Sequence, residues 1–236
     1  MIAHASAEQC LSFIHSQLQA SGRAGESAKK DVRRAVTISR QAGCGAGVVA
    51  EKLADYLHQP AAGNGGSWTV FDRNLIDKVL EDHNLPTRLA KFLPEDRISQ
   101  LEDILADVFE VHPPSETIVY QSTETILRLA DMGNAILIGR GGNIITAKLP
   151  HVLHVRLVAP FARRVEYAHQ FYNLTGNEAH KFCLNQDRAR ERYLKKYFNA
   201  NIDDPLLYHL VINTDLVGYD QAAQLIGDAV LSMHPG

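Results

Sequence analysis

The chain has 236 residues, 45% of them hydrophobic, and carries a formal net charge of -3. This length supports one main hydrophobic core with a small appendage. The weakly acidic balance gives no general attraction to nucleic acid or to an anionic membrane, so any anion site must be local. No stretch approaches the roughly 20 apolar residues that a membrane-spanning helix needs.

The cysteines indicate a reducing compartment. Cys10, Cys44 and Cys183 are far apart in the sequence, and they form neither a C-x-x-C pair nor a zinc-binding cluster. The N-terminus has no basic leader followed by an apolar run. We therefore expect a cytoplasmic protein without a nucleic acid or membrane partner.

The first segment differs from the rest of the chain. Cys10, Leu11, Ile14 and Leu18 share one helical face, and a small, polar and charged stretch follows over residues 21–30. We predict an N-terminal helix and linker over residues 1–34 and one domain over residues 35–236. The apolar stripe is expected to pack on that domain or on a second copy of the chain, which leaves a homodimer open.

From residue 35 onward, short apolar runs alternate with helical patterns. The predicted strands are 35–39, 68–71, 135–138, 152–158 and 209–212. The predicted helices are 47–57, 74–83, 98–111, 116–132, 161–172, 177–198 and 221–232. Strands buried on both faces that alternate with helices predict a parallel sheet covered by helices on both sides. Ligands of such a sheet bind beyond the carboxyl ends of its strands.

A glycine loop follows the first predicted strand. It reads SRQAGCGAGVV and runs directly into a helical pattern, with glycines at positions 43, 45 and 47. Such a loop points backbone amides inward, and the helix N-terminus behind it adds partial positive charge, so the segment is typical of a phosphate site.

The loop departs from the usual G-x-x-x-x-G-K-[ST] pattern. Arg40 stands at the first glycine, Ala46 at the lysine and Gly47 at the hydroxyl residue. If the site is catalytic, another cation must replace the lysine, and Arg40 is the nearest because a guanidinium grips phosphate in a bidentate way. Mg²⁺ would be held by phosphates and waters, with Ser39 or an unidentified acidic residue as further candidates.

Other candidates follow the later strands. Asp72 and Arg73 come after the second strand, where the aspartate is placed to cap a helix and the arginine to bind an anion or form a surface ion pair. Arg140 lies between glycines after the third strand, which favours a ligand role. Arg164 follows the fourth strand and is either a phosphate contact or part of a solvated helix face.

A basic cluster lies in the long predicted helix that ends near residue 198. Arg188 and Arg192 share a face at i, i+4, Lys195 lies near them, and Arg190 points elsewhere. Like charges on one face repel unless an anion is bound, so the cluster predicts either a cationic lid over phosphates or a solvated basic face.

Taken together, these segments resemble the cytidylate kinase-like branch of the nucleoside monophosphate kinases. The resemblance runs from about residue 36 to the C-terminus and rests on VTISRQAGCGAGVVAEKLADYL, VFDRNLI, ILIGRGG, VRLVAPFARR, DRARERYLKKYF and DDPLLYHLVINTDLVG. In this branch the S-R-Q-x-G-x-G loop replaces the lysine-containing loop. The sequence departs from the family in two places. Ordinary cytidylate kinases have an aspartate that helps to recognise cytosine where this chain has Gly141. Many members of the branch have an arginine shortly after the loop glycines, where this chain has Gly47 and Val48.

The resemblance implies an α/β fold of three layers, of the P-loop NTPase type, with a parallel five-stranded sheet, a helical lid and here an N-terminal helical extension. Site roles follow by position. The loop residues Gly43, Cys44, Gly45, Ala46, Gly47 and Val48 would bind the donor triphosphate. Asp72, Arg73, Arg140 and Arg164 would bind the acceptor, and Arg40, Arg188 and Arg192 would be catalytic.

The hypothesis from the sequence is thus phosphoryl transfer from ATP, with Mg²⁺, to a nucleoside monophosphate, with CMP or dCMP the leading acceptor. Two alternatives stay open. One is a nucleotide-binding regulatory protein that has lost phosphoryl transfer, and the other is a kinase for a non-nucleotide acceptor.

Overall fold

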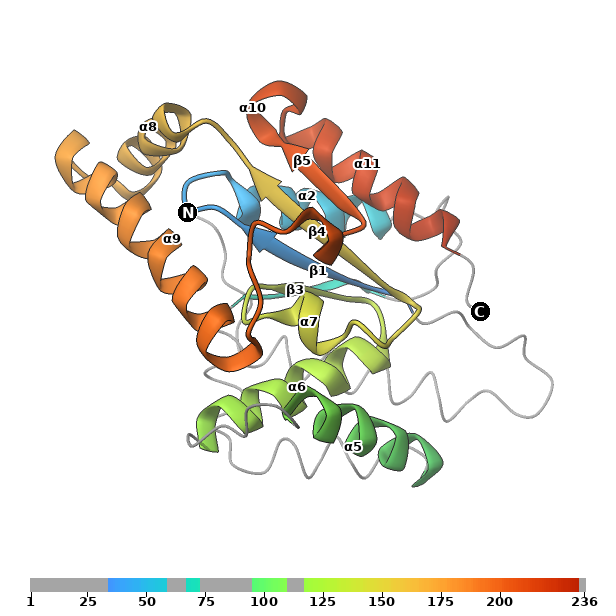
Figure 1. The fold of residues 1–236 in the computed structure, drawn as a ribbon. Helices are drawn as coiled ribbons and strands as arrows, with labels where there is room; N and C mark the ends of the chain where they lie inside the picture. Colours follow the sequence, from blue (N-terminus) through green and yellow to red (C-terminus); the bar gives the residue numbers. More distant parts are fainter. Residues whose placement is uncertain (1–33, 59–66, 73–94, 110–116, 234–236) are drawn as a thin grey trace.

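A parallel five-stranded sheet forms the centre of the protein (Figure 1). The computed structural model describes residues 34–58, 67–72, 95–109 and 117–233. The strands lie in the order β2-β3-β1-β4-β5, and every neighbouring pair is parallel. Their bounds are β1 Ala35–Arg40, β2 Thr69–Phe71, β3 Ala135–Ile138, β4 Val152–Val158 and β5 Leu210–Asn213.

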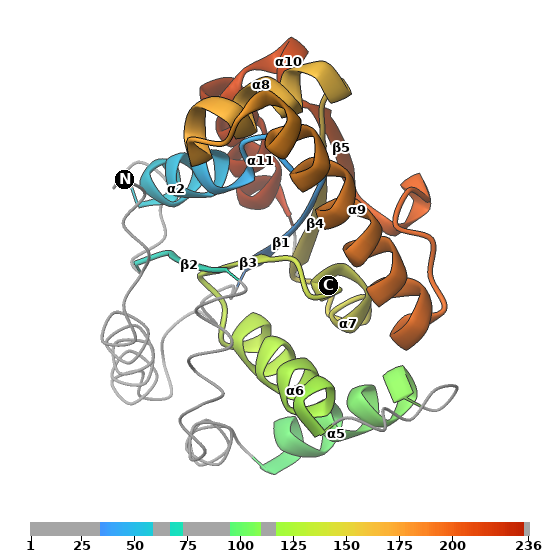
Figure 2. The same ribbon diagram turned by 90° about the vertical axis from the view of Figure 1, so that its left-hand side faces the viewer.

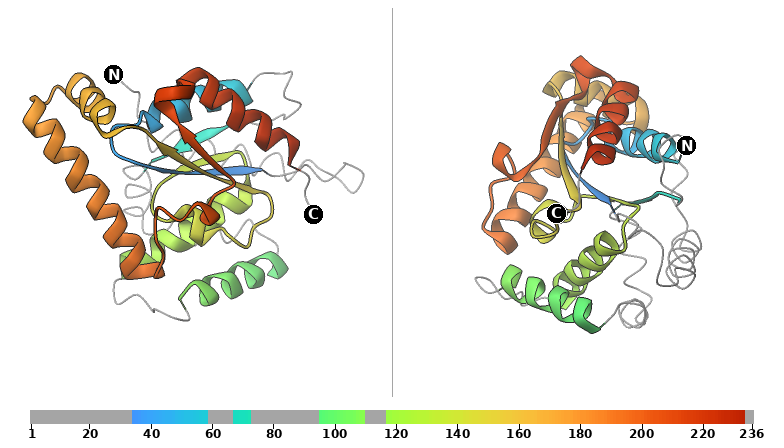
Figure 3. Two further views of the ribbon diagram at one scale, coloured as in Figure 1. Left: turned by 45° about the horizontal axis from the view of Figure 1, so that its top comes forward. Right: turned by 90° about the vertical axis from the view of Figure 1, so that its right-hand side faces the viewer.

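Helices cover both faces of this sheet (Figure 2). One face carries α2 (Ala46–Leu57) and α11 (Tyr219–Ser232). The other carries α6 (Thr117–Met132) and the short α7 (Gly142–Ile145), and α5 (Glu95–Phe109) lies outside α6, farther from the sheet (Figure 3). This gives the three layers that alternating strands and helices predict.

Successive strand residues divide into two cores because they point to opposite faces of the sheet. In β1, Val36 and Ile38 pack with α2 and α11, whereas Ala35 packs with α5, α6 and α7. In β3, Ile136 faces the first core and Leu137 the second. The three central strands β1, β3 and β4 are buried on both sides, and this explains why they read as continuous apolar runs.

A helical pair, α8 (Phe161–Tyr172) and α9 (Gly176–Phe198), lies beside the sheet at the carboxyl ends of the strands (Figure 1). Helix α9 begins with a capping box, in which Thr175 Oγ1 accepts from the Glu178 amide and the Glu178 carboxylate accepts from the Thr175 amide. It ends at Asn199, whose left-handed backbone stops the helix. The 23-residue helix therefore has sequence signals at both ends.

The predicted fold class is confirmed, with all five strands within one or two residues of their expected bounds. Three short elements were not predicted, namely α7, the 3₁₀ turn Pro205–Leu207 and α10 (Thr214–Val217). The predicted helices at 1–34 and 74–83 lie outside the described residues, so the N-terminal segment, the domain boundary and a homodimer stay predictions. Within the described ranges, no helix has the length and apolar character needed to cross a membrane.

Candidate active site

A pocket of about 290 Å³ opens at the carboxyl ends of β1 and β3. The chain leaves β1 toward α2 on one face and leaves β3 toward α7 on the other, which is where a parallel sheet forms a crevice. Helix α9 closes the pocket from the side. Its lining residues are Thr37, Ile38, Ser39, Arg40, Gly139, Arg140, Gly141, Gly142, Asn143, Gln186, Ala189, Arg190, Tyr193, Leu194 and Ile202.

The turn after β3 has an unusual backbone. Gly139, Arg140 and Gly141 have φ angles of 88°, 55° and 74°, so three consecutive residues are left-handed. A side chain at Gly139 would collide with the Arg40 guanidinium, because an added Cβ would lie 1.9 Å from Nη1. Arg140, which is not a glycine, adopts this disfavoured region at the pocket, as residues at ligand sites often do.

Two arginines supply the positive charge of the pocket. Arg40 extends from the end of β1 and Arg190 from α9, and both line the cavity. Burial lowers the pKa of Arg40 to about 10, and the nearby Arg190 charge adds to this effect, which Asp72 offsets only in part. Within the described part of the chain, the Arg40 guanidinium has neither a hydrogen bond nor an ion pair.

Arg190 itself has one carboxylate neighbour. Its Nη1 lies 3.3 Å from Asp187 Oδ1, one turn earlier on α9. Burial still lowers the pKa of Arg190, and Asp187 opposes that shift. The pocket therefore contains two partly desolvated guanidinium groups, and among the described residues the carboxylates that act on them are Asp72 and Asp187, the latter shared with Arg164.

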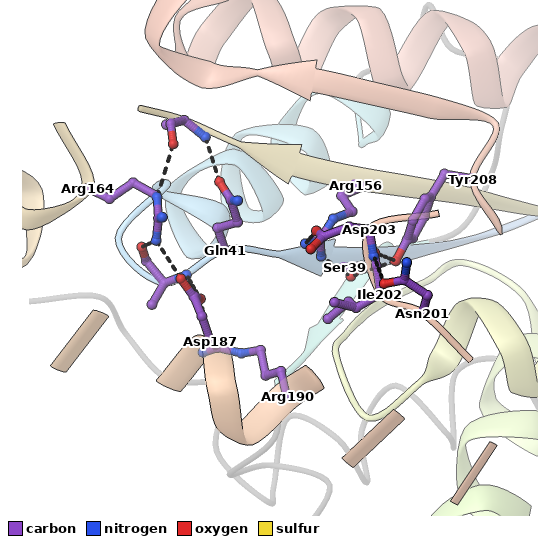
Figure 4. A network of polar contacts seen from close by, with 12 residues as sticks. Ser39, Gln41, Arg156, Arg164, Asp187, Arg190, Asn201, Ile202, Asp203 and Tyr208 are labelled. Atoms are coloured by element: carbon purple, nitrogen blue, oxygen red, sulfur yellow. Dashed lines mark hydrogen bonds and ion pairs between the residues drawn. The ribbon is translucent and has the colours of Figure 1, made fainter. Parts of the chain in front are cut away.

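Asp187 joins α9 to the glycine loop (Figure 4). Its carboxylate accepts from the Ala42 amide at 2.7 Å and from Arg164 Nη1 at 2.6 Å. Arg164 is buried, and it also donates to the carbonyls of Ala42 and Ala159 and lies over the Phe161 ring. These contacts assign Arg164 a structural position that fixes the loop against α8 and α9.

A second network holds the segment after α9 onto the sheet (Figure 4). Arg156, buried in β4, donates to Ser39 Oγ at 2.9 Å and to Asp203 Oδ1 at 2.6 Å. The Tyr208 hydroxyl lies 3.2 Å from the same Ser39 oxygen and donates to the Ile202 carbonyl. The end of α9 is thereby tied to β1 at the edge of the pocket.

The glycine loop has the geometry of an anion site at a helix N-terminus. Gly45 caps α2 with φ 77°, and the Tyr219 ring packs against it so closely that an added Cβ would lie 2.4 Å from a ring carbon. The amides of Gly47 and Val48 belong to the first helical turn, and neither has an acceptor among the described residues. The loop therefore fits a phosphate chain of a nucleotide.

The described residues do not offer a comparable site for Mg²⁺. No group of three or more His, Cys, Asp or Glu side chains gathers in this part of the chain. The loop position that usually carries a hydroxyl is Gly47, and Ser39 already contacts Arg156 and Tyr208. Ser39 also lines the pocket, and its help in holding the metal stays a prediction, beside phosphate oxygens and waters as ligands.

Comparison with known proteins decides the family. The model of the cytidylate kinase-like family matches residues 35–216, which is most of the chain. This protein belongs to the cytidylate kinase-like family. The resemblance inferred from the sequence is confirmed.

A solved structure agrees on the fold. An uncharacterized protein from Eubacterium ventriosum superposes with a TM-score of 0.65 at 16% identity, over 84% of this chain and 98% of that one. Shikimate kinase from Bacteroides thetaiotaomicron has a TM-score of 0.45 at 10% identity over the same shares of the two chains.

One curated protein shares part of the sequence. A protein named uronate isomerase, from Corynebacterium glutamicum, is 29% identical over 115 residues. The match covers 49% of this chain and 22% of that protein, so this family member spans only about a fifth of its relative's length.

The structure brings some predicted site residues of this family member together and separates others. Arg40 and Arg140 line the pocket. Arg188 and Arg192 are exposed on α9, and Arg190, which was expected to point elsewhere, faces the cavity instead. Asp72 lies outside the lining but near Arg40, and Arg73 lies outside the described residues. The loop residues Gly43, Cys44, Gly45, Ala46, Gly47 and Val48 and the buried Arg164 are not part of the pocket wall.

Sequence reasoning missed Arg190, Asn143 and Asp187. A signal for Arg190 existed, because the buried residues Ala179, Cys183 and Leu194 of α9 recur at the spacing that also includes position 190. The mutual spacing of the arginines groups Arg188 with Arg192, whereas the spacing of the buried residues of α9 groups Arg190 with the inward face of the helix. Asn143 and Asp187 had no comparable signal, because their importance comes from contacts with distant segments.

Proposed function

We propose that this cytidylate kinase-like protein transfers the γ-phosphoryl group of ATP, in the presence of Mg²⁺, to a nucleoside monophosphate, with CMP or dCMP the leading acceptor. The observation that carries the proposal is the pair Arg40 and Arg190, which share a pocket at the strand ends where burial lowers the pKa of both guanidinium groups. Two partly buried like charges oppose each other unless an anion lies between them. Phosphate oxygens suit two guanidinium groups because each can donate two parallel hydrogen bonds.

The reaction asks the chain mainly for positioning and positive charge. An oxygen of the acceptor's phosphate forms a bond to the γ-phosphorus while the bond from that phosphorus to the β,γ-bridging oxygen breaks. The products are ADP and a nucleoside diphosphate. The acceptor oxygen is already a nucleophile, and no general base is needed.

The roles of the chain's own groups follow from their positions. The amides of Gly47 and Val48 and the N-terminus of α2 hold the donor phosphates. Arg40 and Arg190 stabilise the charge that spreads over the transferred group, which is the task of the lysine that Ala46 replaces. Arg140 contacts the acceptor from the opposite wall. The same proposal has the protein act in the cytoplasm on free nucleotides, a view supported by its weakly acidic net charge.

A coupled assay tests the proposal. Purified protein is incubated with ATP, Mg²⁺ and each of CMP, dCMP, UMP, AMP and GMP in turn, and ADP formation is followed together with the diphosphate product. We expect turnover with at least one monophosphate, fastest with CMP or dCMP, and none after chelation of Mg²⁺.

Two results would contradict the proposal in different ways. Saturable ATP binding without any diphosphate product would favour a regulatory nucleotide-binding protein. ATP-dependent turnover that appears only with a non-nucleotide alcohol or acid would favour a kinase of another substrate class.

A further inference from the structure

The pocket has two chemically different regions. Along α9 the lining residues Gln186, Arg190 and Leu194 are spaced by four, so the wall changes from turn to turn over roughly 12 Å. The charged turn at Arg190 faces the Arg40 side of the cavity. The next turn presents Tyr193 and Leu194, an aromatic and an apolar side chain.

The turn after β3 runs from one region to the other. At its start, Gly139 packs against the Arg40 guanidinium. Two residues later Gly141 lies against the Phe198 ring, where an added Cβ would be 2.7 Å from a ring carbon. Phe198 ends α9, so this part of the turn lies at the aromatic end of the helix. Asn143 follows two residues later, after Gly142, which lies against Thr37 of β1.

Asn143 is a buried amide with an unmet hydrogen bond. It is 5% exposed, it lines the pocket, and its Nδ2 is enclosed without a hydrogen-bond partner among the residues that the structure describes. An enclosed amide donor without an acceptor costs about 1–3 kcal/mol, so such groups are rare in the absence of a function. A ligand group in the pocket is the partner that this position calls for.

The chemistry of the region fits a nucleobase. A carboxamide carries a donor and an acceptor side by side in one plane, and the edge of a base presents a matching pair. An aromatic side chain such as Tyr193 offers a surface for a flat base. The cations then lie where the 5′-phosphate would be.

We propose that Asn143 recognises the base edge of the acceptor nucleotide through its side-chain amide, an inference that rests on the proposed function. Because the amide can rotate, Asn143 pairs with amino-bearing bases (cytosine, adenine) and with oxo-bearing bases (uracil, guanine). The protein therefore uses position 143 to read that a base is present, and the discrimination between an amino and an oxo group at this position is small.

The substitution Asn143→Asp makes this testable. A carboxylate only accepts hydrogen bonds, so it pairs with an amino group and repels a carbonyl oxygen. Cytosine carries an amino group where uracil carries a carbonyl oxygen, so we expect the ratio of affinities for CMP over UMP to rise at least tenfold relative to the unmodified protein. Titration calorimetry measures these ratios without turnover.

Three controls separate base recognition from other effects. Inorganic phosphate, titrated by ³¹P NMR, reports the general cost of the new negative charge, which cancels in the base ratios. Asn143→Ala should lower the affinity for the nucleotides about tenfold and leave the affinity for phosphate within twofold of the unmodified protein. Asn185→Ala, at an exposed asparagine of α9, should change neither.

The outcomes are distinguishable. The base-reading role is overturned if Asn143→Asp leaves the ratio of nucleotide affinities unchanged. It is also overturned if Asn143→Ala lowers the affinities for phosphate and nucleotide equally. In both cases the proposed function stands. If Asn143→Asp does not fold, the Asn143→Ala comparison decides alone. If the unmodified protein binds phosphate but none of the four monophosphates and forms no diphosphate, the proposed function itself fails.

Discussion

At Arg190, burial and the nearby charge of Arg156 act in the same direction. Both lower the stability of the charged form, and only Asp187 opposes them among the described carboxylates. A phosphate that enters the pocket would relieve this repulsion, so the guanidinium is more strongly stabilised with ligand than without it. The positive charge expected from a loop lysine is thereby supplied from a helix and a strand end.

Removal of Arg190 should therefore impair catalysis more than folding. We expect Arg190→Ala to lower kcat/KM about 100-fold or more, in the range found when one charge-stabilising group is removed. Steady-state kinetics with the best acceptor measures this. Lys181→Ala, which removes an exposed cation from the same helix, is the matched control and should stay within twofold.

The same kinetics compare the faces of α9. Arg188 and Arg192 are the catalytic arginines expected from the sequence, but they are exposed in this structure. A larger loss for Arg188→Ala or Arg192→Ala than for Arg190→Ala would show that α9 turns its other face to the substrate during turnover.

The close contact between Gly45 and Tyr219 makes a second prediction for a single residue. Gly45→Ala meets both a left-handed backbone and a ring carbon 2.4 Å from the added Cβ. We expect a loss of at least about 1–2 kcal/mol in the free energy of unfolding, measured in urea, together with weaker ATP binding. Gly176→Ala is the control, because its added Cβ has no neighbour within 4 Å and α9 accepts alanine. Equal stability of the two variants would contradict the tight packing of the loop.

At the scale of elements, α9 and the glycine loop are coupled through Asp187. One carboxylate fixes a loop amide and the buried Arg164, so the loop and the helix that bears Arg190 hold a fixed relative position. A displacement of α9 would change both the donor site and the pocket. The arrangement links the two halves of the proposed reaction site.

Loss of this carboxylate should loosen α9. Asp187→Asn leaves the Arg164 charge buried without its partner, which we expect to cost about 2 kcal/mol of unfolding free energy, less than for a fully buried pair because Asp187 is partly exposed. Hydrogen exchange should also rise in the amides of α9. Glu191→Gln, an exposed acid on the same helix, should change neither quantity. Unaltered exchange in Asp187→Asn would show that other contacts hold the helix.

At the scale of the whole molecule, the sheet contains a buried histidine that should make stability depend on pH. His154 in β4 is hydrogen-bonded to Thr37 Oγ1 at 2.8 Å and stacks near His209. Burial lowers the pKa of His154 to about 4, and the neighbouring His209 contributes. In the unfolded chain the pKa is about 6.5, so the folded state binds fewer protons than the unfolded state between these values.

The burial of His154 should make the folded state less stable at acidic pH. The contribution of His154 is fully present above about pH 6.5 and is lost as the pH falls toward 4, by up to about 3 kcal/mol. Urea unfolding at several pH values should show that His154→Gln has a shallower loss of stability in this window than the unmodified protein. The exposed His58→Gln should keep the original slope. Identical slopes for the protein and its His154→Gln variant would contradict the assigned burial effect.

Much of the molecule follows from local patterns. Buried parallel strands require apolar side chains on both faces, and helices require apolar residues at intervals of three and four, so runs such as AVTIS and AILI mark their elements without knowledge of the fold. The loop from Arg40 to Val48 also shows its chemistry locally, because glycines between a strand and a helix determine where amides point. These patterns sufficed for the five-stranded parallel sheet and for the family.

The site depended on contacts between distant segments. Arg164 could be assigned to a ligand or to a solvated face until the structure showed it paired with Asp187, 23 residues later. Arg190 is distinguished from Arg188 and Arg192 by the direction in which α9 packs. Asn143 is distinguished from other asparagines by its burial in the pocket that α9 helps to line. The sequence by itself determined the five strands and the long helices, because these obey short-range periodicity, and the place of the glycine loop, because its composition is local. Only the tertiary structure decided which arginine and which amide face the pocket, because burial and pairing depend on how α9 packs against the strand ends.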